Sequence, residues 1–190
     1  MHLSWFYFFT VFWTGAAVLV VEIGAIRLLS IQFGSSLTVL SGVLAVILFA
    51  LSCGYFLGGK LADFRPSRRL LYSLITCAGI LLLGLSSVAL AVAHPAHSIA
   101  NSVGPLTLAL SFFFLPAFIL GIDSPFITKL LTLKTPEREG ALVGLVFFWS
   151  TLGSIVGSLS TGFILLPHLG IEATFFWTSC SLIVLGLMGL

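Results

Sequence analysis

Charged side chains are rare along the chain and fall into a few short clusters. The uncharged, mainly apolar runs between the clusters cover 1–21, 28–59, 70–122, 140–171 and 173–190. A membrane-spanning helix needs about 20 such residues, and no run shows the alternation with a period of two that is typical of barrel strands. The longest run holds two spans and a polar turn at 94–105. The pattern therefore predicts six transmembrane helices, near 5–31, 37–61, 70–93, 105–132, 137–166 and 171–190.

The composition excludes a soluble globular domain. Of the 190 residues, 59% are hydrophobic and 7% are charged, and the mean hydropathy is +1.22. A soluble domain carries about 25% charged residues, because polar side chains have to cover its surface. We therefore expect a single all-α membrane domain over 1–190, with the lipid bilayer as its surroundings and no soluble catalytic domain. A net charge of +2 does not indicate a nucleic-acid partner.

The basic residues predict the orientation of the chain. Every lysine and arginine except Arg27 lies in or beside the predicted connections at 61–69 and 133–136. With six spans, these connections share one side of the membrane with both termini. Because lysine and arginine accumulate on the cytoplasmic side, we expect a multi-pass protein of the inner or plasma membrane with both termini in the cytoplasm.

Small residues recur every four positions in the second and fifth predicted helices. Gly54 and Gly58 show this spacing in the second helix, and Gly153 and Gly157 show it in the fifth. A spacing of four places residues on one helix face, where small side chains let two backbones approach closely. We expect these glycines to form helix-packing faces, although such faces occur in many helical bundles.

The two halves of the chain also share a pattern of charges. The first predicted helix carries Glu22 and then Arg27, and the fourth carries Asp123 and then Lys129. The parallel predicts two inverted repeats of three helices, an architecture common among transporters. In that architecture a homodimer would enclose a transport path.

Three ionisable residues within the predicted spans are candidate substrate-binding residues: Glu22, Arg27 and Asp123. Intramembrane charges are costly and often functional. Glu22 and Arg27 lie about 140° apart around their helix and should find partners on other helices, so a structural ion pair is the alternative. Asp123 lies between Pro116 and Pro125, a setting that predicts a kinked or broken helix. There the alternative is that Asp123 caps the restarted helix.

The end of the second predicted helix carries a polar segment that could serve as a cytoplasmic gating motif. Its candidate residues are Gly59, Lys60, Asp63, Arg65, Arg68 and Arg69. Lys60 and Asp63 are three positions apart, share a helix face and can pair. The alternative is an ordinary basic cytoplasmic loop.

The sequence contains no recognisable catalytic or cofactor-binding motif. Glycines lie in apolar helices rather than in phosphate-binding loops. His94 and His97 in the outer turn, even joined by His168, are too weak a pattern to indicate a metal site. We therefore expect no catalytic residues, no cofactor and no metal in this chain, and whether it belongs to an enzyme is left open.

Several stretches together resemble one known family. The first stretch is Gly15-Ala16-Ala17 with Glu22 and Arg27-Leu28-Leu29. The second runs from Gly54 through Asp63, and the third from Leu115 through Phe126. The fourth runs from Ser150 through Gly157 and includes Leu165-Leu166-Pro167 further along the chain. They resemble the membrane domain of membrane-bound spermidine-synthase-like proteins, which is described as a major-facilitator-like domain fused to a spermidine synthase. The loop from Gly59 to Arg69 also looks like the major-facilitator motif between the second and third helices, but Pro66-Ser67 stand where a glycine is usual.

The resemblance implies a function for the membrane domain. In that family a cytosolic aminopropyltransferase domain follows the last helix and performs the chemistry. We expect this chain to anchor such a domain or partner subunit, and to bind or pass a polyamine-like amine. The alternatives are a small transporter that acts alone as a dimer, and a purely structural membrane anchor.

Overall fold

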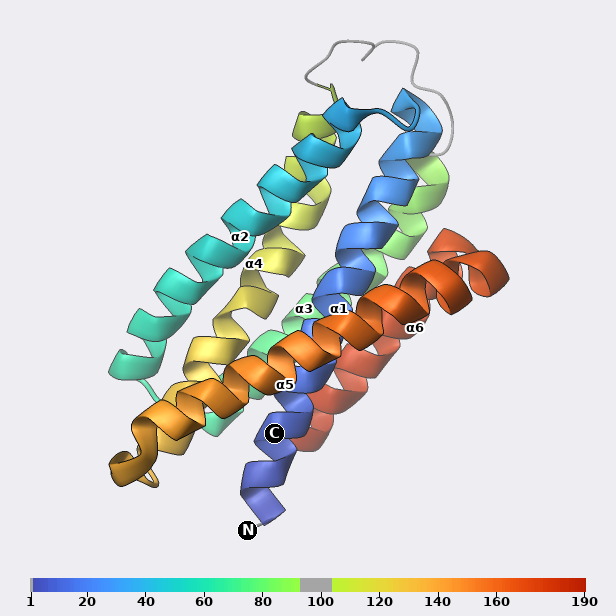
Figure 1. The fold of residues 1–190 in the computed structure, drawn as a ribbon. Helices are drawn as coiled ribbons and strands as arrows, with labels where there is room; N and C mark the ends of the chain where they lie inside the picture. Colours follow the sequence, from blue (N-terminus) through green and yellow to red (C-terminus); the bar gives the residue numbers. More distant parts are fainter. Residues whose placement is uncertain (1, 93–103) are drawn as a thin grey trace.

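The computed structural model describes residues 2–92 and 104–190, and these residues form helices and no strands. Residues 93–103, which hold most of the predicted outer turn with His94 and His97, lie outside the described part. The helices, shown in Figure 1, are α1 (His2–Phe33), α2 (Leu37–Phe64), α3 (Arg68–Val92), α4 (Gly104–Thr132), the 3-10 turn η1 (Pro136–Arg138), α5 (Glu139–Ser160), the π-helix η2 (Thr161–Leu165) and α6 (Leu166–Gly189).

The prediction of six separate membrane-spanning helices is wrong. Within the described residues, five helical segments are long and apolar enough to cross a membrane, and the last of them covers 51 residues, Glu139–Gly189, with a kink at Gly170. The predicted ranges 137–166 and 171–190 separate two helices there, but Pro167 lies in the first turn of α6, where proline is tolerated. Only Gly170, with φ 77° and ψ 178°, leaves the helical conformation. Five segments also do not divide into two repeats of three helices, so that part of the prediction is wrong too.

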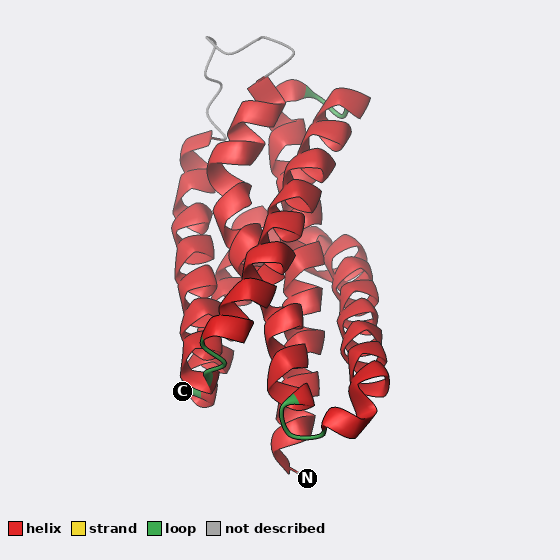
Figure 2. Cartoon of the chain, turned by 90° about the vertical axis from the view of Figure 1, so that its left-hand side faces the viewer, coloured by secondary structure: helices red, strands yellow, loops and turns green. Residues whose placement is uncertain are grey.

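Pairs of helices form the bundle. The most extensive contacts join α2 to α4, α3 to α6, and α1 to α5. Helices α1 and α4 also contact each other, and each touches most of the remaining helices, so they form the centre of the bundle. Seen from the side in Figure 2, both ends of the chain lie at the same end of the bundle.

Helix α4 is continuous, so the predicted break beside Asp123 does not occur. Pro116 and Pro125 both lie inside Gly104–Thr132. A proline removes one backbone hydrogen bond, and neighbouring helices can compensate for this loss in a membrane bundle. Pro125 leaves the carbonyl of Gly121 without its usual helical donor. The restart that Asp123 was expected to cap is therefore absent from the described helix.

Glycines allow the closest helix approaches. A Cβ atom added at Gly58 would lie 2.8 Å from the Cα of Ile122, and one added at Gly54 would overlap the backbone of α4. A Cβ atom added at Gly153 or Gly157 would overlap the backbone of α1. The structure thus places these glycines in the α2–α4 and α1–α5 interfaces.

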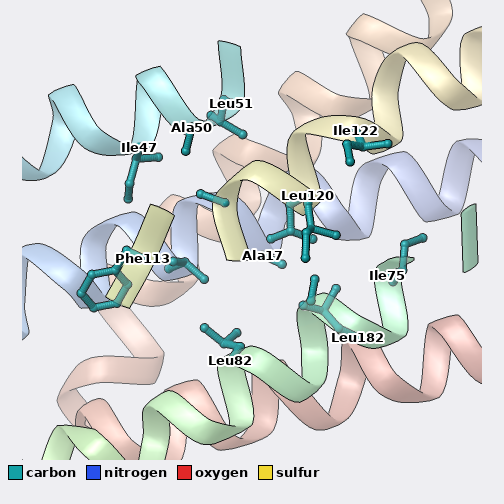
Figure 3. Close-up of a cluster of buried hydrophobic side chains, with 14 of the residues drawn as sticks. Ala17, Ile47, Ala50, Leu51, Ile75, Leu82, Phe113, Leu120, Ile122 and Leu182 are labelled. Carbon is teal, nitrogen blue, oxygen red and sulfur yellow. The ribbon is translucent and has the colours of Figure 1, made fainter. Parts of the chain in front are cut away.

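The core and the outer surface are both apolar. Figure 3 shows buried side chains from several helices meeting in the core, among them Ile47, Leu82, Phe113 and Leu182, each 0% exposed. Many large apolar side chains instead face outward, especially along α5. An apolar exterior of this kind fits lipid rather than water. Several long apolar helices are therefore compatible with a membrane protein.

Candidate functional site

A polar cavity of about 210 Å³ lies among α1, α2, α4 and α5. Its polar lining residues are Thr14, Glu22, Tyr55, Ser124, Ser150 and Ser154. Hydroxyl groups and a carboxylate are hydrogen-bond acceptors, and together they suit a cationic or hydrogen-bonding ligand. A cavity of about 270 Å³ among α1, α5 and α6 has a mainly apolar lining without a charged residue, and one of about 230 Å³ is lined only by aromatic residues of α1 and α5. The polar cavity is therefore the candidate functional site.

Glu22 supplies the only negative charge among the residues that line this cavity. It lies on α1, eight positions after Thr14, so the two side chains share one helix face. Glu22 is half-buried, and the structure records no ion pair or hydrogen bond for its side chain among the described residues. Its carboxylate is therefore available to a ligand in the cavity.

The α1–α5 contact holds one wall of the cavity in place. The Ser154 hydroxyl on α5 donates a hydrogen bond to the Gly15 carbonyl on α1, with a distance of 3.1 Å. Beside it, a Cβ atom added at Gly15 would lie 2.5 Å from the Ser150 carbonyl oxygen. Only glycine permits this approach, which brings Ser150 and Ser154 to the same cavity as Glu22.

Asp123 lies behind the cavity rather than in its wall. Its side chain is 0% exposed, and neither carboxylate oxygen has a hydrogen-bond partner among the described residues. The Thr14 hydroxyl lies within interaction range of this carboxyl group, although it donates its hydrogen bond to the Val11 carbonyl at 3.3 Å. Thr14 also lines the cavity, so it stands between Asp123 and that space.

The three predicted substrate-binding residues therefore have different surroundings. Glu22 lines the cavity, Asp123 is sealed behind Thr14, and Arg27 is exposed and does not line the cavity. Thr14 and Tyr55 were not predicted. The eight-residue spacing between Thr14 and Glu22 is a signal that could have identified Thr14.

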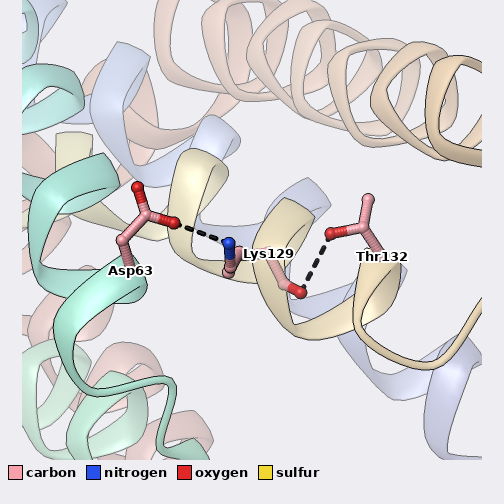
Figure 4. Close-up of polar contacts among 3 residues, drawn as sticks. All are labelled: Asp63, Lys129 and Thr132. Carbon is pink, nitrogen blue, oxygen red and sulfur yellow. Dashed lines mark hydrogen bonds and ion pairs between the residues drawn. The ribbon is translucent and has the colours of Figure 1, made fainter. Parts of the chain in front are cut away.

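The polar segment at the end of α2 makes its contacts away from the cavity. The Lys129 ammonium lies 2.6 Å from a carboxylate oxygen of Asp63 (Figure 4), so the predicted pairing of Asp63 with Lys60 is wrong. The Lys60 ammonium instead lies 4.2 Å from the centre of the Phe56 ring. The prediction failed because α4 brings a closer cation to Asp63 than its own helix does.

Arg68 has a defined partner at the same end of the bundle. Its Nε donates a hydrogen bond to the Gly189 carbonyl at 2.9 Å, which joins the start of α3 to the end of α6. The other predicted gating residues, Gly59, Arg65 and Arg69, do not line the polar cavity. Their proposed gating role stays a prediction.

The described residues contain no group of three or more His, Cys, Asp and Glu side chains that could hold a metal ion. His168 lies within the described part, where its Nδ1 lies 2.9 Å from the Ile164 carbonyl oxygen. The candidate site therefore consists of a carboxylate, hydroxyl groups and apolar side chains.

Comparison with known proteins gives one distant similarity. No family model matches the chain, and no solved structure matches it. Over 163 residues, 84% of this chain, it is 27% identical to "Polyamine aminopropyltransferase 2" of Streptomyces coelicolor (strain ATCC BAA-471 / A3(2) / M145). The match covers 29% of the length of that relative. The similarity supports a link to spermidine-synthase-like proteins but does not show a major-facilitator-like domain.

Proposed function

We propose that this chain is the membrane module of a polyamine aminopropyltransferase-like system. The observation that carries the proposal is the similarity to a protein named polyamine aminopropyltransferase, which extends over 84% of the chain. The long apolar helices fit a membrane module. Because the match covers 29% of the relative, the proposal assigns aminopropyl transfer to a separate catalytic domain or partner subunit.

The proposed ligand of the module is the amine itself, bound in the polar cavity. An ammonium group loses its hydration when it enters a buried site, so it requires a carboxylate or other acceptors there. Glu22 supplies the carboxylate, and Ser150, Ser154 and Tyr55 supply hydroxyl oxygens. The cavity of about 210 Å³ would take one end of a linear amine.

The proposed docking position for the catalytic domain is the basic end of the bundle. Lys129 and Asp63 meet there, and Arg68 binds the Gly189 carbonyl at the same end. Because basic residues accumulate on the cytoplasmic side, this end faces the cytoplasm in our proposal. A cytosolic aminopropyltransferase docked there would be held at the membrane by the same module that binds its amine substrate.

Calorimetric titration of the purified chain in lipid nanodiscs tests the proposal. We expect a linear polyamine to bind with measurable heat, and a neutral diol of similar length to give none, because the diol lacks the charge that Glu22 would stabilise. Equal binding of both compounds, or binding of neither, would contradict the amine function. Retention of a co-expressed aminopropyltransferase in the membrane fraction tests the docking proposal separately.

A stand-alone transporter acting as a homodimer is the second candidate. The outward-facing side chains Phe147, Phe148 and Ile155 on α5 favour it, because they offer an apolar face to a second copy. Amine uptake by proteoliposomes that contain only this chain would support it. A purely structural anchor is the third candidate, and in that case Glu22→Gln would change stability without changing any amine binding.

A further inference from the structure

Asp123 is a buried acid that the amine site does not use. It is fully buried, both of its oxygens lack a hydrogen-bond partner among the described residues, and it does not line the cavity. An isolated negative charge at this depth is too costly to persist without a compensating positive charge. An amine in the cavity would contact Glu22 and not Asp123, because Asp123 does not line the cavity. The cation that neutralises Asp123 therefore has to be small enough to reach a fully buried carboxyl group.

The surroundings of Asp123 supply oxygen atoms for such a cation. The Thr14 hydroxyl lies within interaction range of the carboxyl group. The carboxylate oxygens of Asp123 and the Thr14 hydroxyl are the acceptors that the structure offers a small cation at this depth.

The helices packed against α4 bring few other titratable groups near Asp123. Helix α3 contributes Tyr72, which is within electrostatic range of Asp123 and whose hydroxyl lies 3.1 Å from the Thr10 hydroxyl. Helix α1 contributes Glu22, and α2 contributes Tyr55, both at the cavity. Helix α5 contributes Ser150 and Ser154, which do not titrate. Helix α3 also contributes a cation, Arg68, whose guanidinium carbon lies 5.6 Å from the centre of the Tyr72 ring.

We propose that Asp123 holds a small monovalent cation, either a proton or Na⁺, and that this cation leaves when a cationic amine binds beside Glu22. The coupling rests on the amine-binding function proposed above. Thr14 separates the two carboxyl groups, and a positive charge added beside Glu22 favours the ionised, cation-free carboxylate of Asp123. Binding of the amine therefore expels the smaller cation.

The path for the cation runs through Thr14. If the cation is a proton, the O–H bond of the Asp123 carboxylic acid breaks, and the proton passes by the Thr14 hydroxyl to water in the cavity, leaving the carboxylate. If it is Na⁺, no covalent bond changes and the ion leaves by the same side. In both cases amine affinity falls as the concentration of the small cation rises.

Two release measurements on the full chain in nanodiscs distinguish the cations. A pH indicator in weak buffer reports protons released on addition of spermidine, and radioactive sodium bound before the addition reports released Na⁺. We expect one of these signals from the wild-type protein and its loss in Asp123→Asn. Glu172→Gln, which removes an exposed acid of α6 that does not line the cavity, is the matched control and should retain the signal. Thr14→Val should slow the release, whereas Thr14→Ser should restore it.

The result that overturns the proposal is a wild-type protein that binds amine and releases neither cation, or a release that persists in Asp123→Asn. A wild-type protein that binds no amine overturns the proposed function instead. The cation site is then tested alone on the ligand-free chain, by infrared difference spectra recorded after a change of pH or of Na⁺ concentration. A carboxyl band in the wild-type spectrum that is lost in Asp123→Asn would support the cation site. Absence of this band from the wild-type spectrum would contradict it.

Discussion

The Lys129 ammonium group lies 2.6 Å from a carboxylate oxygen of Asp63 and joins the end of α2 to α4. The two helices pack along their whole length through Gly54 and Gly58, so the ion pair sits at one end of an interface already formed by close backbone contact. The side chains of Lys129 and Asp63 are 37% and 70% exposed. A pair as exposed as this one positions the two helix ends relative to each other but adds little to the free energy of unfolding.

We predict that Lys129→Gln and Asp63→Asn each lower the free energy of unfolding by less than about 1 kcal/mol, since exposed ion pairs are strongly screened. The double variant Asp63→Lys, Lys129→Asp should restore the wild-type value. Thermal unfolding of the four proteins in detergent measures these differences. A loss several times larger in either single variant would show that the pair is more protected than its exposure indicates.

The glycine interfaces should be far more sensitive. Gly153→Ala places a methyl group into the backbone of α1, and overpacking of this kind costs about 1–3 kcal/mol. Gly144→Ala on the same helix is the matched control, because a Cβ atom there meets nothing within 4 Å. It should be neutral or stabilise the helix by up to about 1 kcal/mol. Unfolding temperatures compare the two, and equal values would contradict the packing account.

The sequence identifies apolar helices well but not how they are joined. Long apolar runs are a direct consequence of burial in lipid, so α1 to α4 lie close to their predicted ranges. The sequence predicts a separation between 166 and 171, whereas in the structure only Gly170 departs from helical geometry there. The break predicted in α4 beside Asp123 overestimated the effect of Pro116 and Pro125 on that helix.

The candidate site was only partly visible in the sequence. Glu22 stood out because charge is rare in a span, but Tyr55 and Thr14 have side chains that are common in apolar helices. Sequence alone also grouped Glu22 with Asp123, whereas the folded chain puts Thr14 between Asp123 and the cavity. Such assignments depend on which helices meet, and local spacing does not contain that information.

The proposed orientation predicts which end of the bundle is accessible from outside the cell. In a variant with the three native cysteines replaced, Ser35→Cys and Thr135→Cys place single thiols at exposed positions on opposite ends. Because the basic end should face the cytoplasm, a membrane-impermeant thiol reagent should label Ser35→Cys in intact cells. It should label Thr135→Cys only after permeabilisation, and the reverse pattern would invert the topology.

The most direct test of the central claim compares spermidine binding to the wild-type chain, Glu22→Gln and Arg27→Gln by calorimetry in nanodiscs. Glu22 lines the polar cavity, whereas Arg27 lies on the same helix but is exposed and outside it. Loss of a charge-assisted hydrogen bond of about 1.5–3 kcal/mol weakens binding roughly tenfold or more. We predict this loss in Glu22→Gln and an unchanged Kd in Arg27→Gln. An unchanged Kd in Glu22→Gln would contradict the assignment of the polar cavity as the amine site.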